Sequence, residues 1–191
     1  MITFNFYYDL YFWLAFAAVV VGFRLLNFNA VVKSIFLCVG SMLMILALPR
    51  FDLTSLVFLL LLSLFTFLVG WLLLSDVFRE KKVVGIFISG GAIILLVTTL
   101  AFFKYHLLQS YFFQTIVEMK GGASEIIFII GISYFSFKMI HFVIESYKRQ
   151  IKHLSLLNFL NYIFFFPSFI SGPINRYNQF CEQLAVKKEN R

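Results

Sequence analysis

Long runs of apolar residues, separated by short polar segments, dominate the chain. A membrane-spanning α-helix needs roughly 20 mostly apolar residues, and six stretches approach that length. These stretches are Phe4–Phe23, Ala30–Leu48, Leu53–Ser75, Val83–Phe103, Ile126–Ile144 and Leu154–Ile170. Runs such as Leu56–Leu62 show no period-two alternation. Lipid offers the backbone no hydrogen-bond partners, so the pattern predicts helices that satisfy their own N–H and C=O groups.

The sixth stretch is interrupted by residues that break regular helix. Pro167, Gly172 and Pro173 lie at or just beyond its end, and irregular backbone at membrane depth is tolerated only against protein or a water-lined cavity. The basic tail 187–191 is expected in the cytoplasm, but it would lie outside the cell if the sixth stretch crossed the membrane completely. We therefore favour a re-entrant or strongly kinked segment over a full crossing.

Composition supports an all-α, polytopic integral membrane protein with about five to six spanning helices plus this re-entrant or kinked segment. Hydrophobic residues make up 61% of the 191 residues and charged residues 13%, and the mean hydropathy is +0.91. Too few charges remain to cover a soluble domain of this size. Residues 1–191 are predicted to form a single membrane domain.

The net charge of +7 predicts orientation rather than nucleic-acid binding, because the basic residues lie at the ends of the spans. With the N-terminus outside, the inner loops carry eight basic residues and the outer loops three. The inner ones are Arg24, Lys33, Arg79, Lys81, Lys82, Lys148, Arg149 and Lys152, and the outer ones are Arg50, Lys104 and Lys120. The positive-inside rule then predicts a multi-pass protein of the cell membrane with an outer N-terminus.

Two further segments suggest local structure. The mixed apolar and polar residues of Lys104–Glu125 suit either an amphipathic helix lying in the membrane interface or an ordinary loop. Gly90 and Gly91 within the fourth span suggest close helix packing. The scattered histidines and the two remote cysteines lack metal-ligand spacing, so no metal site is expected.

The fifth span carries polar residues on one face. Lys138, His141 and Glu145 are spaced i, i+3 and i+7, so they share one side of a helix. Charged groups within a bilayer normally face protein or water. Two interpretations stay open: a polar path through the protein, or a helix–helix contact in which Lys138 reaches a carbonyl. Arg176, directly after the broken segment, suits an anionic or phosphate-bearing group.

Three sequence elements resemble the membrane-bound O-acyltransferase family. They are Phe102–Tyr105 (FFKY), Gly131–Lys138 (GISYFSFK) and Phe165–Tyr177 (FFPSFISGPINRY). The resemblance is closest to the bacterial branch that contains alginate O-acetyltransferase and the D-alanyl transfer protein of teichoic acid modification. It covers Ala101–Phe180 specifically.

This resemblance implies a funnel through the membrane and transfer of an acyl group from a cytoplasmic thioester to a hydroxyl of an extracellular or cell-envelope polymer, as in polysaccharide acetylation. The donor would be acyl-CoA or an acyl carrier protein, with no bound cofactor. Membrane lipid, the carrier protein and an extracytoplasmic transfer protein are the implied partners. Six residues are candidates for the funnel or substrate path: Lys138, His141, Pro167, Gly172, Pro173 and Arg176.

One departure concerns the family's catalytic histidine, which lies well downstream of the GPIxR element. The histidines here are His106, His141 and His153, and all of them precede it. The catalytic group is therefore expected beyond Arg191, and the chain is expected to be the N-terminal half of a larger fold, with a missing C-terminal half as a further partner. A non-catalytic membrane scaffold or accessory subunit and a small transporter remain as alternatives.

Overall fold

Apolar helices account for all of the regular structure in the described residues. The computed structural model describes residues 10–25, 29–47, 53–76, 82–104, 131–169 and 175–185. Within these ranges the elements are α1 (Leu10–Leu25), α2 (Ala30–Leu46), α3 (Leu53–Leu74), α4 (Lys82–Lys104), α6 (Ile132–Tyr147), α7 (Leu156–Phe164), α8 (Phe166–Phe169) and α9 (Tyr177–Ala185). Among them, α3 and α4 are long and apolar enough to cross a membrane, and α2 is apolar but shorter.

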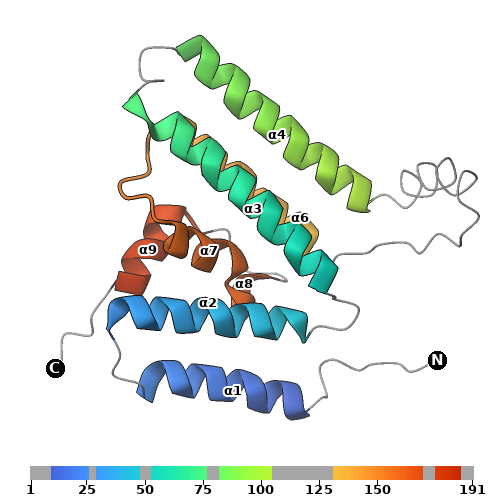
Figure 1. The fold of residues 1–191 in the computed structure, drawn as a ribbon, viewed down its shortest axis with the longest axis vertical. Helices are drawn as coiled ribbons and strands as arrows, with labels where there is room; N and C mark the ends of the chain where they lie inside the picture. Colours follow the sequence, from blue (N-terminus) through green and yellow to red (C-terminus); the bar gives the residue numbers. More distant parts are fainter. Residues whose placement is uncertain are drawn as a thin grey trace, which may run out of the picture.

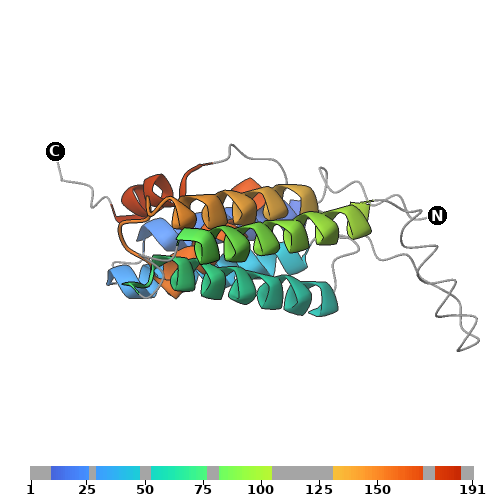
Figure 2. The same ribbon diagram turned by 90° about the horizontal axis from the view of Figure 1, so that it is seen from above.

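The helices form two groups joined by the C-terminal elements. α3, α4 and α6 run side by side in both views (Figures 1 and 2). α1 packs on α2, and α7 packs on α2 from the other side. The elements α7, α8 and α9 therefore fill the space between α2 and α3 (Figure 1), which is where the largest buried side chains lie.

The outward faces of the helices are apolar. On α2, Val31, Ile35, Val39 and Leu43 are all exposed, and their spacing of four residues forms one stripe along the helix. On α4, Phe87 is 75% exposed. Exposed apolar stripes of this size are typical of helix faces that contact lipid or another protein.

Small residues allow α4 to approach its neighbours. Gly85, Ser89 and Ala92 form the buried face of α4, and α4 packs mainly against α6. The sequence-based assignment of this role to Gly90 and Gly91 is wrong: within the described chain, no atom lies within 4 Å of a Cβ built on either residue. The buried stripe is offset from this glycine pair because a helix turns about 100° per residue.

The predicted spans match the helices unevenly. Each of the first five stretches contains one helix, although residues 1–9 and 126–130 lie outside the described residues. The sixth, Leu154–Ile170, for which a re-entrant or strongly kinked segment was favoured over a full crossing, is two short helices with a break at Phe165. The predicted interfacial segment Lys104–Glu125 lies outside the described residues except for Lys104, which ends α4.

Candidate functional site

The chain reverses direction between α7 and α9. The hydroxyl of Tyr162 in α7 donates to the backbone carbonyl of Asn175, which lies just before α9, at 3.0 Å. At the beginning of α7, the backbone N–H of Ser155 donates to the hydroxyl oxygen of Tyr177 at 3.3 Å. The start of α9 thus lies beside the start of α7, and the chain leaves this part of the bundle at the end where it entered.

Polar contacts at the protein surface confirm where α9 lies. Asn178 donates to the carbonyl of Gln150 at 2.6 Å, and Lys152 forms an ion pair with Glu182 at 3.2 Å. Gln150 and Lys152 belong to the segment that links α6 to α7. α9 is therefore bound to the same linker that precedes α7.

Pro167 explains why α7 does not continue. A proline has no N–H to donate to the carbonyl four residues earlier, which here belongs to Ile163. Proline is tolerated in the first turn of a helix, because no intrahelical partner is needed there, and Pro167 occupies that position in α8. The break at Phe165 therefore leaves carbonyls at the end of α7 in need of other donors.

Lys138 supplies those donors from α6. Its Nζ lies 2.9 Å from the carbonyl oxygen of Tyr162, 3.3 Å from that of Ile163 and 2.7 Å from the hydroxyl oxygen of Ser168. The side chain is 2% exposed, and its ammonium group also lies 5.2 Å from the centre of the Tyr134 ring. An ammonium has three protons to donate, and three acceptors surround this one. Lys138 thus holds the broken end of α7 and the start of α8 together.

Gly131 brings the beginning of α6 against the end of α8. Its φ angle is +80°, a left-handed conformation that L-residues with side chains rarely adopt. A Cβ on this residue would lie 2.8 Å from the carbonyl oxygen of Phe169. The glycine that opens the GISYFSFK element is therefore required both by the backbone turn and by the approach of the FFPSF element.

Glu145, near the C-terminal end of α6, binds the start of α9. Its Oε2 accepts from the backbone N–H of Tyr177 at 3.3 Å, and the carboxylate is buried. A negative charge is favourable at the N-terminus of a helix, where backbone N–H groups lack intrahelical partners. Seven residues, or about 10 Å of helix, separate Glu145 from Lys138.

Two polar groups on the same face of α6 make no hydrogen bond within the described chain. The hydroxyl of Tyr134 and Nδ1 of His141 are buried atoms without a hydrogen bond there. Nδ1 lies 3.7 Å from the Glu145 carboxylate, longer than a hydrogen bond, and the His141 side chain is 34% exposed. Tyr134, Lys138, His141 and Glu145 form one line along α6, called here the polar stripe. Lys138 and Glu145 of this stripe hold the fold through hydrogen bonds, whereas the Tyr134 hydroxyl and His141 Nδ1 make none within the described chain.

The structure describes four of the six predicted path residues, and these four lie in three parts of the chain. Lys138 and His141 belong to the polar stripe, and Pro167 is exposed at the start of α8. Arg176 is exposed just before α9, and its guanidinium forms no hydrogen bond with the described chain. Gly172 and Pro173 lie outside the described residues. No three His, Cys, Asp or Glu side chains of the described chain gather to hold a metal ion.

Sequence reasoning missed three contributors to this site. Tyr134 belongs to one of the three family-like elements but is not among the predicted path residues. The sequence analysis assigned no role to Tyr162 or Tyr177, yet both are buried and their rings pack edge to face, 5.7 Å apart. A signal was available for Tyr134, because it precedes Lys138 by four residues and so shares its helix face.

Sequence comparison with known proteins finds a family match over most of the chain. The profile of the MBOAT, membrane-bound O-acyltransferase family, matches residues 51–190. The chain is 36% identical over 62 residues to a teichoic acid D-alanyltransferase of Streptococcus thermophilus, which covers 32% of this chain and 15% of that protein. It is 41% identical over 68 residues to the protein of that name from Bacillus subtilis, covering 34% of this chain and 17% of the relative.

The matched segments therefore cover a small part of these relatives. A third teichoic acid D-alanyltransferase, from Lacticaseibacillus rhamnosus, is 38% identical over 58 residues, which are 30% of this chain and 14% of that protein. The family profile extends much further along the chain and includes both sequence elements that meet at Lys138. The chain belongs to the membrane-bound O-acyltransferase family.

Proposed function

We propose that this chain forms part of an O-acyltransferase that moves an acyl group from a cytoplasmic thioester to a hydroxyl of a cell-envelope polymer. The relatives named above suggest D-alanine as the acyl group and teichoic acid as the acceptor. Family membership supports acyl transfer as the reaction class. Donor and acceptor come from resemblance alone, because function follows the site rather than the fold.

One observation carries the proposal: the two family elements meet inside the bundle. Lys138 of the first element donates to Ser168 of the second at 2.7 Å, and Gly131 of the first lies against Phe169 of the second. Thirty residues of sequence separate Lys138 from Ser168. Burying a lysine at this depth is costly unless every donor is satisfied, so the contact fixes one geometry for the reversed segment.

Within this geometry, Lys138 is a positioning residue and Tyr134 and His141 are the groups free to meet substrate. All three ammonium donors of Lys138 are used by the protein. The unpaired hydroxyl and imidazole on the same face suit hydrogen bonds to an acceptor hydroxyl or a thioester carbonyl. The catalytic base of the reaction is not assigned to either residue.

The basic end of the bundle is proposed to face the cytoplasm. The starts of α2 and α4 and the linker before α7 lie at the same end of the bundle as α9 (Figure 1), and they carry Lys33, Lys82 and Lys152. Lys104, the last residue of α4, lies at the opposite end of the bundle. This orientation is the one that the positive-inside rule favours, with the N-terminus outside. It places α7 to α9 as a re-entrant segment that enters from the cytoplasm and returns. A basic surface at that end would attract an acidic carrier protein.

The test is the amount of ester-linked acyl group on the cell envelope. Cells that lack the gene, cells that express the unaltered protein, and cells that express Lys138→Met or a Tyr134→Phe/His141→Ala double variant are compared, with membrane protein levels measured by immunoblot. We expect loss of the ester in the deletion strain, recovery with the unaltered protein, and at least a tenfold loss per molecule of the double variant. Unchanged ester content in the deletion strain would refute the proposal.

An accessory subunit is the second candidate, and the engagement of Lys138 and Glu145 favours it. Both charged groups of the polar stripe are occupied by structural contacts, as in a scaffold. An accessory subunit would show a different result in the same assay. The double variant would support normal ester levels as long as the protein is present in the membrane, because Tyr134 and His141 would then contact no substrate.

A further inference from the structure

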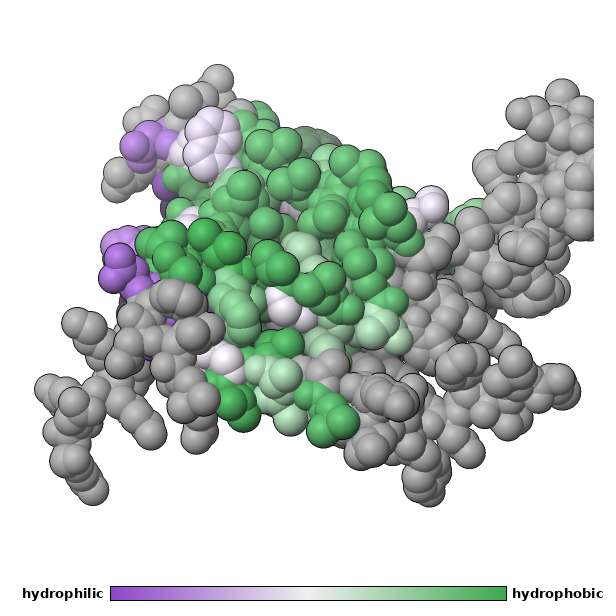
Figure 3. Space-filling view, turned by 60° about the horizontal axis from the view of Figure 1, so that its bottom comes forward, coloured by the Kyte–Doolittle hydropathy of each residue, from purple (hydrophilic) through white to green (hydrophobic). Residues whose placement is uncertain are grey.

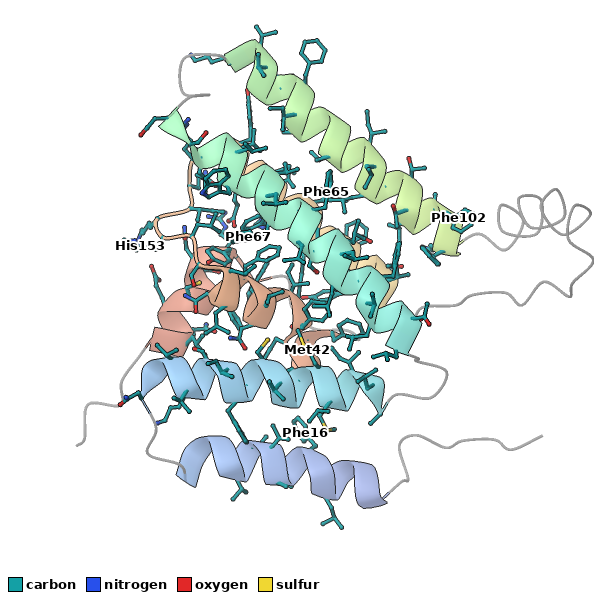
Figure 4. The ribbon with its side chains drawn as sticks, viewed as in Figure 1. Phe16, Met42, Phe65, Phe67, Phe102 and His153 are labelled. Atoms are coloured by element: carbon teal, nitrogen blue, oxygen red, sulfur yellow. The ribbon has the colours of Figure 1, made fainter. Side chains whose placement is uncertain are left out.

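A cavity of about 420 Å³ lies between the N-terminal helices and the returning chain. α1 and α2 form one wall, and α8, α9 and the residues beside them form the other. The walls are mostly apolar, and include Val19, Leu37, Met44 and Phe166. Phe16 extends from α1 to within 5.8 Å of the Phe166 ring, measured between ring centres (Figure 4). The volume is within the range of about 300–1,000 Å³ for small-molecule sites.

Lys33 is the one charged residue among the described residues that line this cavity. It lies in the first turns of α2 and is half-buried. No carboxylate of the described chain lies within ion-pair distance of it, whereas Lys152 at the same end is paired with Glu182. A partly buried cation that no protein group neutralises favours an anion beside it.

The surroundings of the cavity identify the kind of anion. Hydrophobic residues cover most of the face that contains α1 and α2, and hydrophilic residues gather at its left-hand end (Figure 3). Val20 lines the cavity and is 42% exposed, so the apolar wall continues onto the outer face. A molecule with one negative charge and a long apolar chain matches both the Lys33 end and the apolar interior.

We infer that this cavity binds an anionic membrane phospholipid, with its phosphate at Lys33 and an acyl chain along α1, α2 and Phe166. The lipid lies against the reversed segment, since Asn175 and Phe180 also line the cavity. It acts as a part of the fold, so the position of the returning chain depends on the lipid composition of the membrane. The site is distinct from the polar stripe, because neither Lys138 nor His141 lines it.

Lipid binding to the purified chain tests this inference. The protein is stripped of lipid in detergent, titrated with phosphatidylglycerol or phosphatidylcholine of identical acyl chains, and followed by native mass spectrometry and thermal unfolding. Lys33→Gln removes the charge, and Lys82→Gln is the matched control, because Lys82 is an exposed lysine at the start of α4. Leu37→Trp narrows the apolar part of the cavity.

We expect the unaltered protein and Lys82→Gln to retain phosphatidylglycerol about tenfold more tightly than phosphatidylcholine. Lys33→Gln should lose this preference, and Leu37→Trp should weaken binding of both lipids. Equal affinity of the unaltered protein for the two lipids, or equal loss in the Lys33 and Lys82 variants, would overturn the inference. Lipid binding is measured without acyl transfer, so a negative result here would leave the proposed function unaffected.

Discussion

Single residues decide where this chain can break its helices. The end of α7 is stable because Lys138 donates to the carbonyls of Tyr162 and Ile163. In a continuous helix the Ile163 carbonyl would pair with the N–H four residues later, which Pro167 lacks. Gly131 adopts a left-handed conformation and has no side chain, so Phe169 of α8, beyond the break, can pack against it. These two residues come from the same short element, which explains why glycine and lysine are found there among aromatic and aliphatic residues.

Replacement of Lys138 by methionine is expected to destabilise the protein. Methionine keeps most of the volume but leaves two carbonyls and the Ser168 hydroxyl without their donor, and an unsatisfied buried polar group costs about 1–3 kcal/mol. Thermal unfolding in detergent measures the effect. Lys82→Met, at an exposed position on α4, should change stability by less than about 0.5 kcal/mol. Equal stability of the two variants would contradict the role of Lys138.

Alanine at Gly131 is expected to cost stability, whereas alanine at Gly91 is not. The left-handed conformation costs an L-residue about 1–2 kcal/mol, and the Cβ would approach the carbonyl of Phe169 at 2.8 Å. Gly91 is helical and open, so alanine there should be neutral or stabilise by up to about 1 kcal/mol. Both are measured by the same unfolding assay, and a Gly131→Ala protein as stable as Gly91→Ala would count against the described turn.

At the scale of elements, α6 organises its neighbours. It packs against α3 and α4 along its length, and through Lys138 and Glu145 it holds the end of α7 and the start of α9. Aromatic rings fill the space between them: Phe142 lies 4.5 Å from Phe159, between ring centres. Phe67 points from α3 toward this cluster (Figure 4) and lies 5.5 Å from the Phe159 ring.

Gly70 of α3 packs directly against Phe142 of α6. A Cβ there would overlap the ring of Phe142, which is fully buried. Gly70→Ala is therefore expected to destabilise by about 1–3 kcal/mol, the usual cost of overpacking a core. Gly90→Ala is the control, because no atom of the described chain lies near a Cβ at that position. Unfolding temperatures that fall equally, or not at all, would show that the two helices are further apart than described.

Glu145 is expected to control the stability of α9 locally. Glu145→Ala removes the buried acceptor of the Tyr177 N–H, so hydrogen exchange of the α9 amides should become faster by an amount equal to about 1–3 kcal/mol of opening free energy. Glu182→Ala removes an exposed partner of Lys152, and such pairs contribute less than about 1 kcal/mol. Similar exchange in both variants would refute the asymmetry between the two carboxylates.

The long apolar helices could be predicted from the sequence, but the break after α7 could not be located. Hydrophobic length alone located α2, α3 and α4 to within a few residues. It could not locate the break in α7, because Phe164, Phe165 and Phe166 are equally apolar and the break depends on Pro167 and on a donor from another helix. Helix spacing predicted the shared face of Lys138, His141 and Glu145, but the hydrogen-bond partners of Lys138 and Glu145 lie 24 to 32 positions away in the sequence.

In the molecule as a whole, the chain turns back inside the bundle and returns to the end where it entered. The contacts of Asn178 and Glu182 with the linker before α7 require this. A chain that crossed the membrane at this point would place α9 beside Lys104 instead. The two arrangements therefore differ in the side of the membrane on which α9 lies.

The direct measurement is the sidedness of single cysteines toward a maleimide that cannot cross membranes. Cys38 and Cys181 are replaced by alanine, and Lys152→Cys, Gln179→Cys and Lys104→Cys are introduced one at a time at positions that are exposed. Sealed vesicles of both orientations are then labelled. If the chain turns back, positions 152 and 179 react from the same side and position 104 from the opposite side. Reaction of position 179 together with position 104 would contradict this reversal.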